Sequence, residues 1–497
     1  MYTENKILIG TGNDPAYLLP QMANRHGLIA GATGTGKTTT LKVMAESFSA
    51  MGVPVFLADV KGDLASLSVP GEDSPKLQER LRLLNMGQVA FKAFPVELWD
   101  IFGEGGHRIR TTISDMGPFL LSRILGLNDT QTGVLTVVFR IADDKGHLLL
   151  DLKDLKAMVQ YVGENSKEYI TDYGNIAPQT IGTIIRNILS LEEQGGEFFF
   201  GEPILDFYDW IKTSANGLGI INILHCVKLF QYPRLYSTFL LWMLSELYEL
   251  LPEVGDLDMP KMVFFFDEAH LLFADAPKVL LEKIELVVKL VRSKGVGVYF
   301  ISQNPADLPQ SVLGQLGNRV QHALRGFTPA EEKMIKAAAE TFRPNPSFET
   351  RQVLTELATG EALVSCLQDD GSPGIVQRVF IVPPQSRFGT IDDQVRTSII
   401  NSSLLNGKYN REIDRESAFE SLASENSEKD QRELAEKNRL EQEKETVRIE
   451  KENKRLEKSA GKPKATPFDK VASSALSTIG REVGRTLIRG ILGSLIK

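Results

Sequence analysis

The segment with the clearest chemical potential lies near the start of the chain, where residues 31–38 read GATGTGKT. This sequence fits the pattern G-x-x-x-x-G-K-[ST] and stands between an apolar run and a helical pattern. In such a loop, backbone N–H groups surround phosphates, the lysine reaches the terminal phosphates and the following hydroxyl binds magnesium. The pattern predicts a site for ATP and Mg²⁺, with Thr38 as a metal ligand. A glycine-rich turn with a chance lysine is the alternative interpretation. The residues expected to contact the nucleotide are Gly31, Ala32, Thr33, Gly34, Thr35, Gly36, Lys37, Thr38 and Thr39.

Two adjacent carboxylates, Asp267 and Glu268, follow the apolar run KMVFFF. We expect Asp267 to hold Mg²⁺ through its water shell and Glu268 to polarise the attacking water as a catalytic base. A protein that only binds the nucleotide needs the second carboxylate far less, so the pair favours hydrolysis. The alternative is an acidic helix cap at the end of a strand. We interpret His270, in the same segment, as the first residue of a helix.

Three further polar residues are candidates for catalysis. Gln303 ends the run VGVYFISQ, where its amide could sense the γ-phosphate or orient the water, although capping of the next turn is an equal alternative. Arg319 and Arg325 lie in GNRVQHALRG, six positions apart and therefore on one face of a strand. Either arginine could neutralise the transition state from a neighbouring subunit, or form a surface salt bridge.

The elements that must position these residues are short, continuous apolar runs separated by amphipathic segments. KILIG, HGLIAGA, VPVFLADV, GIINILH, KMVFFFDEA and VGVYFISQ do not alternate polar and apolar residues, which is typical of strands covered by helices on both faces. The amphipathic segment after the phosphate loop ends at Gly52, and the one before VGVYFISQ ends at Gly295, as helices commonly do. The predicted fold class is α/β, with a mainly parallel sheet.

The chain divides at two places. A long interval separates the second strand from GIINILH, far beyond a normal loop, and its helical periodicity predicts an inserted helical subdomain over residues 104–215. Residues 1–103 and 216–400 are then the two parts of the core. Residues 411–458 are rich in Glu, Lys and Arg without a clean heptad, which favours a solvated helix over a coiled coil. Residues 467–497 predict an amphipathic basic helix that could pack on protein, an anionic membrane or nucleic acid.

Composition limits the classes of function. The 497-residue chain has a formal net charge of −8, so any contact with nucleic acid must come from a local basic patch. Its two cysteines, Cys226 and Cys366, exclude a disulfide framework and a thiolate metal cage and fit a reducing cytoplasm. No apolar stretch has the length of a transmembrane segment, so we expect a cytoplasmic protein.

In their order along the chain, the segments HGLIAGATGTGKTTT, VFLADVKGDLASL, FFFDEAHLLF, GVYFISQNPADLP and NRVQHALRGF resemble the HerA/FtsK branch of P-loop ATPases. The similarity is strongest to bacterial HerA-like proteins of the YjgR type. It implies a RecA-like core in a hexameric ring that binds ATP at subunit interfaces and moves double-stranded DNA through its pore. The resemblance also implies that Asp59 borders the nucleotide. By the same resemblance, the phosphate and metal ligands are Lys37, Thr38 and Asp267, the base is Glu268, the sensor is Gln303 and the finger is Arg319 or Arg325.

Two functions remain open from the sequence. One is an ATP-driven DNA translocase or a helicase-like ring, which the complete catalytic set favours. The other is a non-motor ATPase scaffold that recruits a protein partner through the helical insertion or the C-terminal tail, which the acidic net charge favours. A small-molecule kinase is disfavoured because no arginine-rich lid is evident.

Overall fold

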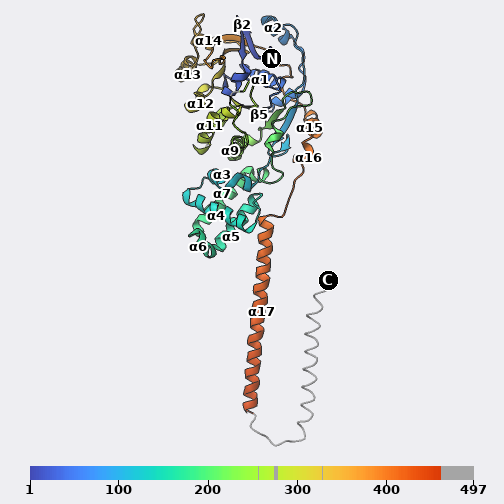
Figure 1. The fold of residues 1–497 in the computed structure, drawn as a ribbon, viewed down its shortest axis with the longest axis vertical. Coiled ribbons are helices and arrows are strands. Elements are labelled where there is room, and N and C mark those ends of the chain that lie inside the picture. Colours follow the sequence, from blue (N-terminus) through green and yellow to red (C-terminus); the bar gives the residue numbers. More distant parts are fainter. Residues whose placement is uncertain (256, 274–277, 327, 460–497) are drawn as a thin grey trace. The chain divides into compact units, whose positions relative to one another are not determined.

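A computed structural model describes residues 1–255, 257–273, 278–326 and 328–459 of the chain, and its described strands form one 13-stranded sheet (Figure 1). The strands are β1 Tyr2–Thr3, β2 Lys6–Gly12, β3 Pro15–Leu18, β4 Gly27–Ala30, β5 Val55–Asp59, β6 Val96–Asp100, β7 His107–Arg108, β8 Ile221–His225, β9 Met262–Phe266, β10 Val296–Ser302, β11 Asn318–His322, β12 Glu361–Ser365 and β13 Gln377–Ile381.

The sheet has a parallel part and an antiparallel flank. Neighbouring strands follow the order β1-β2-β13-β12-β11-β4-β10-β9-β5-β8-β6-β7, and β3 pairs with β2. Every pair from β11 to β7 is parallel, whereas the pairs that join β11, β12, β13, β2, β1 and β3 are antiparallel. The prediction of a mainly parallel sheet is confirmed. The antiparallel flank and the strand β6 were not anticipated.

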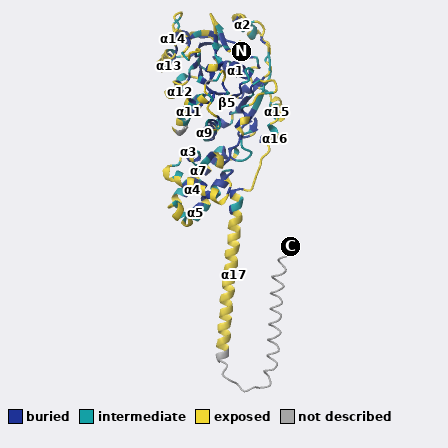
Figure 2. Ribbon diagram, viewed as in Figure 1, coloured by how far each residue is buried: buried dark blue, intermediate teal, exposed yellow. Residues whose placement is uncertain are grey.

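Successive side chains of the central strands point to opposite faces of the sheet, and they form a hydrophobic core on each face. In β9, Phe264 and Phe266 enter the cluster on one face of the sheet, and Phe265 enters the cluster on the other. Helix α1 (Lys37–Ala50) covers the second face, and α9 (Pro233–Leu250) with α11 (Lys278–Leu290) covers the first. Because each buried phenylalanine contributes roughly 1.5–3 kcal/mol, this strand is anchored from both sides. Figure 2 shows these layers as the buried part of the molecule.

The interval between β7 and β8 is largely helical. Its helices are α3 Ile113–Ile124, α4 Asp129–Lys145, α5 Leu152–Glu164, α6 Ser166–Tyr173, α7 Pro178–Leu191 and α8 Glu197–Phe199. Three stretches of this interval have helical periodicity in the sequence, residues 111–127, 130–146 and 177–195, and they form α3, α4 and α7, while α5 and α6 were not predicted. Compared with the predicted range of residues 104–215, helix starts only after β7 and the last α-helix ends at Phe199.

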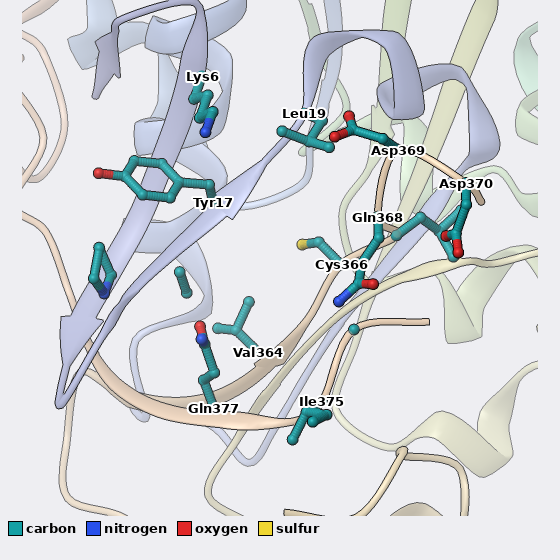
Figure 3. Close-up of a pocket in the computed structure, with 14 residues that line it drawn as sticks. Lys6, Tyr17, Leu19, Val364, Cys366, Gln368, Asp369, Asp370, Ile375 and Gln377 are labelled. Atoms are coloured by element: carbon teal, nitrogen blue, oxygen red, sulfur yellow. The ribbon is translucent and has the colours of Figure 1, made fainter. Parts of the chain in front are cut away.

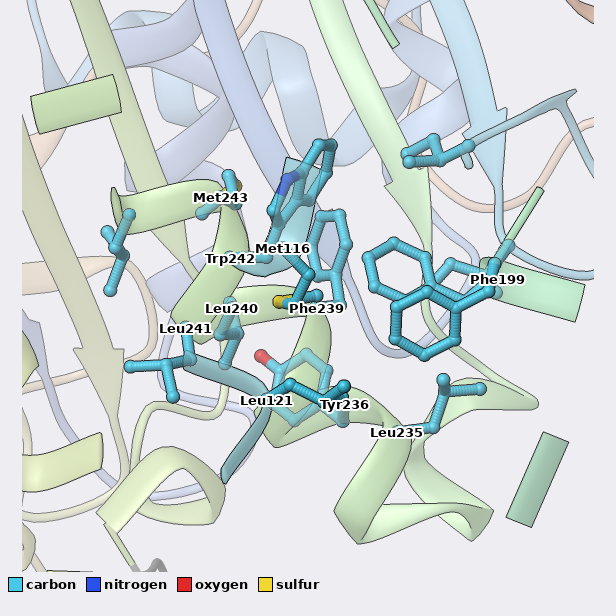
Figure 4. Close-up of a cluster of buried hydrophobic side chains, with 14 of the residues drawn as sticks. Met116, Leu121, Phe199, Leu235, Tyr236, Phe239, Leu240, Leu241, Trp242 and Met243 are labelled. Atoms are coloured by element: carbon cyan, nitrogen blue, oxygen red, sulfur yellow. The ribbon is translucent and has the colours of Figure 1, made fainter. Parts of the chain in front are cut away.

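An apolar cluster joins this insertion to α9. Figure 4 shows Met116 and Leu121 of α3 together with Phe199 of α8 and the α9 side chains Phe239 and Trp242. The rings of Phe199 and Trp242 meet edge to face, with their centroids 5.4 Å apart. Such a contact adds about 0.5–1.5 kcal/mol beyond the area it buries. The insertion is therefore packed on the helix that covers the sheet.

Smaller helices complete the core. These are α2 Pro75–Leu83, α10 His270–Phe273, α12 Gln310–Leu313, α13 Pro329–Glu340 and α14 Thr350–Glu356. Helices α13 and α14 pack with Leu324 and Leu363 in a third, smaller apolar cluster beside β11 and β12. They lie beside the antiparallel pair of β11, which the sequence predicted as a strand, and β12, which it did not.

A segment of residues 403–422, called the strap below, runs over both the core and the insertion. It follows α15 (Asp393–Ser402) and contains α16 (Asn406–Tyr409). Tyr409 is fully buried, its ring lies edge-on to Trp99 at 5.2 Å, and its hydroxyl donates to Asp209. Further along, Arg415 forms two hydrogen bonds to Glu202, at 2.7 and 2.6 Å. The strap thus fastens the end of the core to the insertion.

The chain then continues as α17 (Ala418–Ser459), of which residues 423–459 belong to a separate unit. From residue 423 to 456 every side chain of this helix is exposed, and Glu428 lies 3.1 Å from Arg432 one turn later (Figure 2). The helix begins at Ala418 rather than at the predicted residue 411. Pairing with a second helix stays a prediction, and the predicted basic helix over residues 467–497 lies outside the described residues.

Candidate nucleotide site

The phosphate loop connects β4 to α1 in a conformation that requires glycine. Gly31 has φ +152°, and a Cβ there would lie 2.5 Å from the Cβ of His322. The ring of His322 is buried, with Nε2 2.9 Å from Thr40 Oγ1 and Nδ1 3.0 Å from the Glu361 carbonyl oxygen. Burial lowers the pKa of His322 to about 4, so the ring is neutral at pH 7. A neutral histidine therefore supports the loop from behind.

Lys37 and Thr38 stand in the first turn of α1. The Lys37 ammonium is buried against its own loop and donates to the carbonyl oxygens of Gly31 at 2.6 Å and Ala32 at 3.2 Å. Burial lowers the pKa of Lys37, and the nearby Glu268 carboxylate opposes that shift. Because a helix N-terminus carries free N–H groups and a positive dipole end, the surroundings of Thr38 favour phosphate.

The register of the parallel strands brings the separate motifs to one edge. Ala30 of β4 pairs with Ser302 of β10, and the Gly31 N–H donates to the Ser302 carbonyl at 3.2 Å. On the other side of β10, Phe266 of β9 lies opposite Phe300. Since the carboxyl ends of parallel strands meet at the same edge, the loop and the polar residues that follow β9 and β10 converge there.

Glu268 is held on all sides in a strained backbone conformation. Its φ is +48°, and its N–H donates to Asp267 Oδ1 at 2.9 Å. The Gln303 amide donates to Glu268 Oε2 at 3.3 Å, and His270 Nδ1 also lies 3.3 Å from this oxygen. The Lys61 ammonium lies 2.8 Å from Oε1. A left-handed residue other than glycine or asparagine costs of order 1–3 kcal/mol, and such strain clusters at functional sites.

The pKa values of the two carboxylates are shifted in opposite directions. Burial raises the pKa of Asp267 to about 6, although the charge of Lys61 opposes the shift. Burial also acts to raise the pKa of Glu268, but the hydrogen bond and charge of Lys61 outweigh it, so this pKa is lowered. At pH 7 Glu268 is therefore an ionised acceptor, as a base toward water must be.

Asp59, at the end of β5, shapes the adjoining turn. Its buried carboxylate accepts the N–H groups of Gly62 at 2.7 Å and Leu64 at 3.1 Å. Burial, together with the charge of Asp63, raises the pKa of Asp59 to about 7. Both oxygens are used within the turn, and this turn presents Lys61 to Glu268. The role of Asp59 at the nucleotide stays a prediction.

The donor atoms at this edge fit Mg²⁺. Thr38 offers a hydroxyl and Asp267 a carboxylate, which are the hard oxygen ligands that this ion prefers. No cluster of three or more His, Cys, Asp or Glu side chains suited to a metal occurs among the described residues. In nucleotide sites, Mg²⁺ is commonly held by one or two protein groups together with water and phosphate.

A hollow of about 660 Å³ lies away from this edge, on the antiparallel flank (Figure 3). It is lined from β2 and β3 by Lys6 and Tyr17, and from β12 and β13 by Val364 and Gln377. The Lys6 ammonium lies 5.6 Å from the centre of the Tyr17 ring. None of the residues predicted to bind nucleotide lines this hollow.

Comparison with known proteins places this site in a family. The model of the helicase HerA-like C-terminal family matches residues 4–497. The chain belongs to the HerA-like helicase family. This confirms the resemblance read from the motifs, and it makes the protein a member of a family of P-loop ATPases.

Two relatives illustrate the range of similarity in this HerA-like family. The chain is 31% identical over 125 residues to the probable helicase MJECL08 of Methanocaldococcus jannaschii, covering 24% of this chain and 22% of the relative. It is 21% identical over 379 residues to the DNA double-strand break repair helicase HerA of Sulfurisphaera tokodaii, covering 73% and 67%. The matches therefore span 22% and 67% of the lengths of these relatives.

Solved structures show the same fold. The unbound bacterial conjugative coupling protein TrwB has a TM-score of 0.53 at 14% identity, over 79% of this chain and 92% of that one. The plasmid coupling protein TrwB in complex with ADP and Mg²⁺ has a TM-score of 0.51 at 14% identity, with the same coverage. The HerA-like chain thus has a RecA-like P-loop fold, as predicted.

The two candidate arginines of the HerA-like chain form hydrogen bonds to backbone carbonyl groups outside the carboxylate pair. The Arg319 guanidinium donates to the carbonyl oxygens of Leu313 and Leu316, both at 3.2 Å, near the start of β11. Arg325 lies beyond the end of β11 and is exposed, and it donates to the carbonyl oxygens of Thr355 at 2.7 Å and Leu357 at 3.1 Å. Their six-residue spacing does not place both on one strand, because β11 ends at His322.

Lys61 and His322 belong to no sequence motif that predicts a role for them. The signal for Lys61 is its position in ADVKGD, directly after the strand that neighbours β9. The signal for His322 is weaker, because only the pairing of β11 with β4 places it behind the phosphate loop.

Among the described helices, none is both long enough and apolar enough to span a bilayer.

Proposed function

We propose that this HerA-like protein hydrolyses ATP in an oligomeric ring and uses the energy to move double-stranded DNA. The observation that carries the proposal is the convergence of the phosphate loop, Asp267, Glu268 and Gln303 at one edge of the sheet. A nucleotide-binding scaffold has no need of a strained, ionised glutamate at this position. The name of the HerA relative from Sulfurisphaera tokodaii, a DNA double-strand break repair helicase, supports DNA as the track.

Each group has a separate role in the proposed hydrolysis. The loop N–H groups and Lys37 bind the phosphates, after Lys37 exchanges its contacts with loop carbonyls for phosphate oxygens. Thr38 and Asp267 hold Mg²⁺, which supplies neutralisation of the developing phosphate charge. Glu268 accepts the proton of the attacking water at a carboxylate oxygen, and Gln303 orients that carboxylate through its amide.

The ring assembly is part of the same proposal. Arg325 is the better placed of the two candidate fingers, because it is exposed and its neighbour Ala323 accepts a hydrogen bond from Ala32 of the phosphate loop. Arg319 is half-buried and bonded at the other end of β11. The contact with DNA must be a local basic patch, since the net charge is −8. We also propose a cytoplasmic location, because Cys226 and Cys366 are free thiols.

A non-motor ATPase scaffold is the second candidate. The observation that favours it is the long exposed helix α17, together with the acidic net charge. In that case nucleotide-dependent assembly would recruit a protein partner through the insertion or the tail. Scaffolding requires no contact with DNA phosphates, so the two candidates differ in their response to salt.

The deciding experiment measures steady-state ATP hydrolysis with and without long double-stranded DNA at about 50 and 200 mM salt. Glu268→Gln provides the blank, and omission of Mg²⁺ provides the metal control. Stimulation by DNA that fades at the higher salt supports the translocase and justifies a translocation assay. Hydrolysis that is indifferent to DNA contradicts the translocase and favours the scaffold.

A further inference from the structure

The side chain that contacts Glu268 most closely is Lys61, which belongs to neither motif of the nucleotide site. Its ammonium lies 2.8 Å from Glu268 Oε1 and 4.0 Å from Asp267 Oδ2. Both carboxylates are buried, whereas 43% of the Lys61 side chain is exposed. A charge-assisted hydrogen bond of this length is among the stronger contacts that fix a carboxylate.

The position of Lys61 is set by the chain that carries it. It is two residues beyond β5, the strand paired with β9. The turn that contains it is closed by hydrogen bonds from the N–H groups of Gly62 and Leu64 to Asp59, and Gly62 has φ +76°. A rigid turn of this kind loses little further entropy when its lysine meets a partner. The lysine is thus presented to Glu268 from a neighbouring strand and not from the strand of Glu268 itself.

No other described cation binds Glu268 Oε1. The Lys37 ammonium donates to carbonyl oxygens of its own loop. His270 and Gln303 both approach Oε2, each at 3.3 Å. The two oxygens of Glu268 therefore have different partners, with Lys61 on Oε1 and with Gln303 and His270 on Oε2.

We propose that Lys61 is a positioning residue, which fixes the Glu268 carboxylate where it can accept a proton from the water that attacks ATP. The inference rests on the proposed hydrolysis and adds a component that the phosphate loop and the carboxylate pair do not contain. Lys61 acts through Glu268 and does not itself contact the reacting atoms. Without Lys61, the Glu268 carboxylate keeps only the two 3.3 Å contacts of Oε2, to Gln303 and His270, and Oε1 is free to turn away from its productive orientation.

The test compares Lys61→Met and Lys61→Arg with a matched control, Lys408→Met. Lys408 also pairs with a buried carboxylate, Asp209 at 2.7 Å, and its side chain is also 43% exposed, but it lies in the strap. The readouts are kcat, KM, the Kd of a fluorescent ATP analogue with and without Mg²⁺, and the thermal unfolding midpoint. Lys61→Gln provides a second neutral variant if Lys61→Met does not fold.

We expect Lys61→Met to lower kcat by roughly 10- to 100-fold, because misplacement by about 1 Å has effects of this size. KM and the Kd of the analogue should change by less than about twofold, since a positioning residue acts after binding. Lys61→Arg should recover most of kcat, and Lys408→Met should leave every nucleotide readout unchanged.

Three outcomes would overturn the inference. The first is an unchanged kcat in the neutral variants, the second is a kcat above that of the natural chain, and the third is a loss of kcat matched by an equal loss of nucleotide binding. Failure of the proposed function is distinguishable from all three. In that case the natural chain itself shows no hydrolysis above Glu268→Gln, whatever residue stands at position 61.

Discussion

Two sites in this protein each combine a buried aspartate with a nearby lysine, but the pKa of the aspartate is shifted in opposite directions at the two sites. At the nucleotide edge, Asp267 lies beside a second carboxylate and 4.0 Å from a half-exposed lysine. Beneath the strap, Asp209 accepts hydrogen bonds from Lys212, Lys408 and the hydroxyl of Tyr409. Burial acts to raise the pKa of both, but these three donors outweigh it at Asp209, whose pKa is lowered, whereas that of Asp267 is raised to about 6.

The difference separates a site that stabilises the fold from one that is held ready for a ligand. Every donor around Asp209 comes from the chain itself, so the cluster is complete. Asp267 and Glu268 concentrate negative charge where the chain supplies too little positive charge, which suits a site that a metal ion and its phosphates complete. Substitutions at the nucleotide edge should therefore lower activity without lowering stability, whereas substitutions around Asp209 should lower stability without lowering activity.

The largest effect is expected at the nucleotide edge. Glu268→Gln should lower kcat by roughly 10²–10⁴-fold while ATP binding persists, because the amide cannot accept the proton of water. Lys37→Ala should abolish turnover through loss of phosphate binding. Single-turnover hydrolysis and equilibrium binding of an ATP analogue measure the two effects. Full activity in both variants would show that the predicted nucleotide site is wrong.

Beneath the strap, Asp209→Asn should cost about 1–3 kcal/mol of unfolding free energy and leave hydrolysis by the folded protein unchanged. The folded pKa of Asp209 is lowered from 3.8, so its contribution is present above pH 3.8 and is lost as pH falls toward the folded pKa. Urea unfolding of the natural chain and of Asp209→Asn at pH 7 and pH 3 measures this. A difference in stability between the two that grows toward pH 3 would contradict the expected sign.

The same substitution at the nucleotide edge should have the opposite sign. Asp267→Asn should raise the unfolding free energy at pH 8 by about 1–2 kcal/mol without Mg²⁺ or nucleotide, and should abolish Mg²⁺-dependent hydrolysis. The folded pKa is raised from 3.8 to about 6, so ionisation costs stability above pH 6, and this cost disappears as pH falls toward 3.8. Urea denaturation of the natural chain and of Asp267→Asn at pH 8 and pH 5 tests whether the stability gained by the substitution shrinks at the lower pH. If Asp267→Asn lowered the unfolding free energy at pH 8, the two substitutions would have effects of the same sign and the contrast with Asp209 would be wrong.

The smallest effect is expected at Lys408. Because its side chain is 43% exposed and Asp209 keeps Lys212 and Tyr409, Lys408→Met should lower the unfolding free energy by less than about 1 kcal/mol. Calorimetry of the full chain would detect the change as a small shift in the unfolding midpoint. A shift as large as that of Asp209→Asn would mean that the cluster depends on this lysine alone.

The sequence is most informative where a pattern is local. A loop of consecutive residues predicts the roles of Lys37 and Thr38, and one apolar run with two carboxylates predicts those of Asp267 and Glu268. The structure brings these segments to one edge of the sheet, and the roles themselves stay predictions. Helices α3, α4 and α7 were predictable because their apolar spacing lies within one segment. These features depend on residues close together in the chain.

Features that depend on long-range pairing were not predictable from the sequence. Lys61 reaches Glu268 only because β5 pairs with β9, across about two hundred intervening residues. Strand β6 reads as the mixed segment VELWD, and its burial comes from pairing with β8. Tyr409 stands in a polar segment whose partners, Trp99 and Asp209, are far away in sequence. Nothing in the local pattern records these contacts.

The pairing of β2 with β13 has a consequence for folding during translation. Residues 6–12 leave the ribosome early, but the strand beside them, residues 377–381, is made only after most of the chain. At about 5–20 residues per second, the first strand waits on the order of tens of seconds for its neighbour. During that time β2 is paired with β1 and β3, but the edge that later meets β13 can join another nascent chain. The order of synthesis therefore leaves this edge of β2 open until residues 377–381 have been made, and the nascent chain needs protection from aggregation until then.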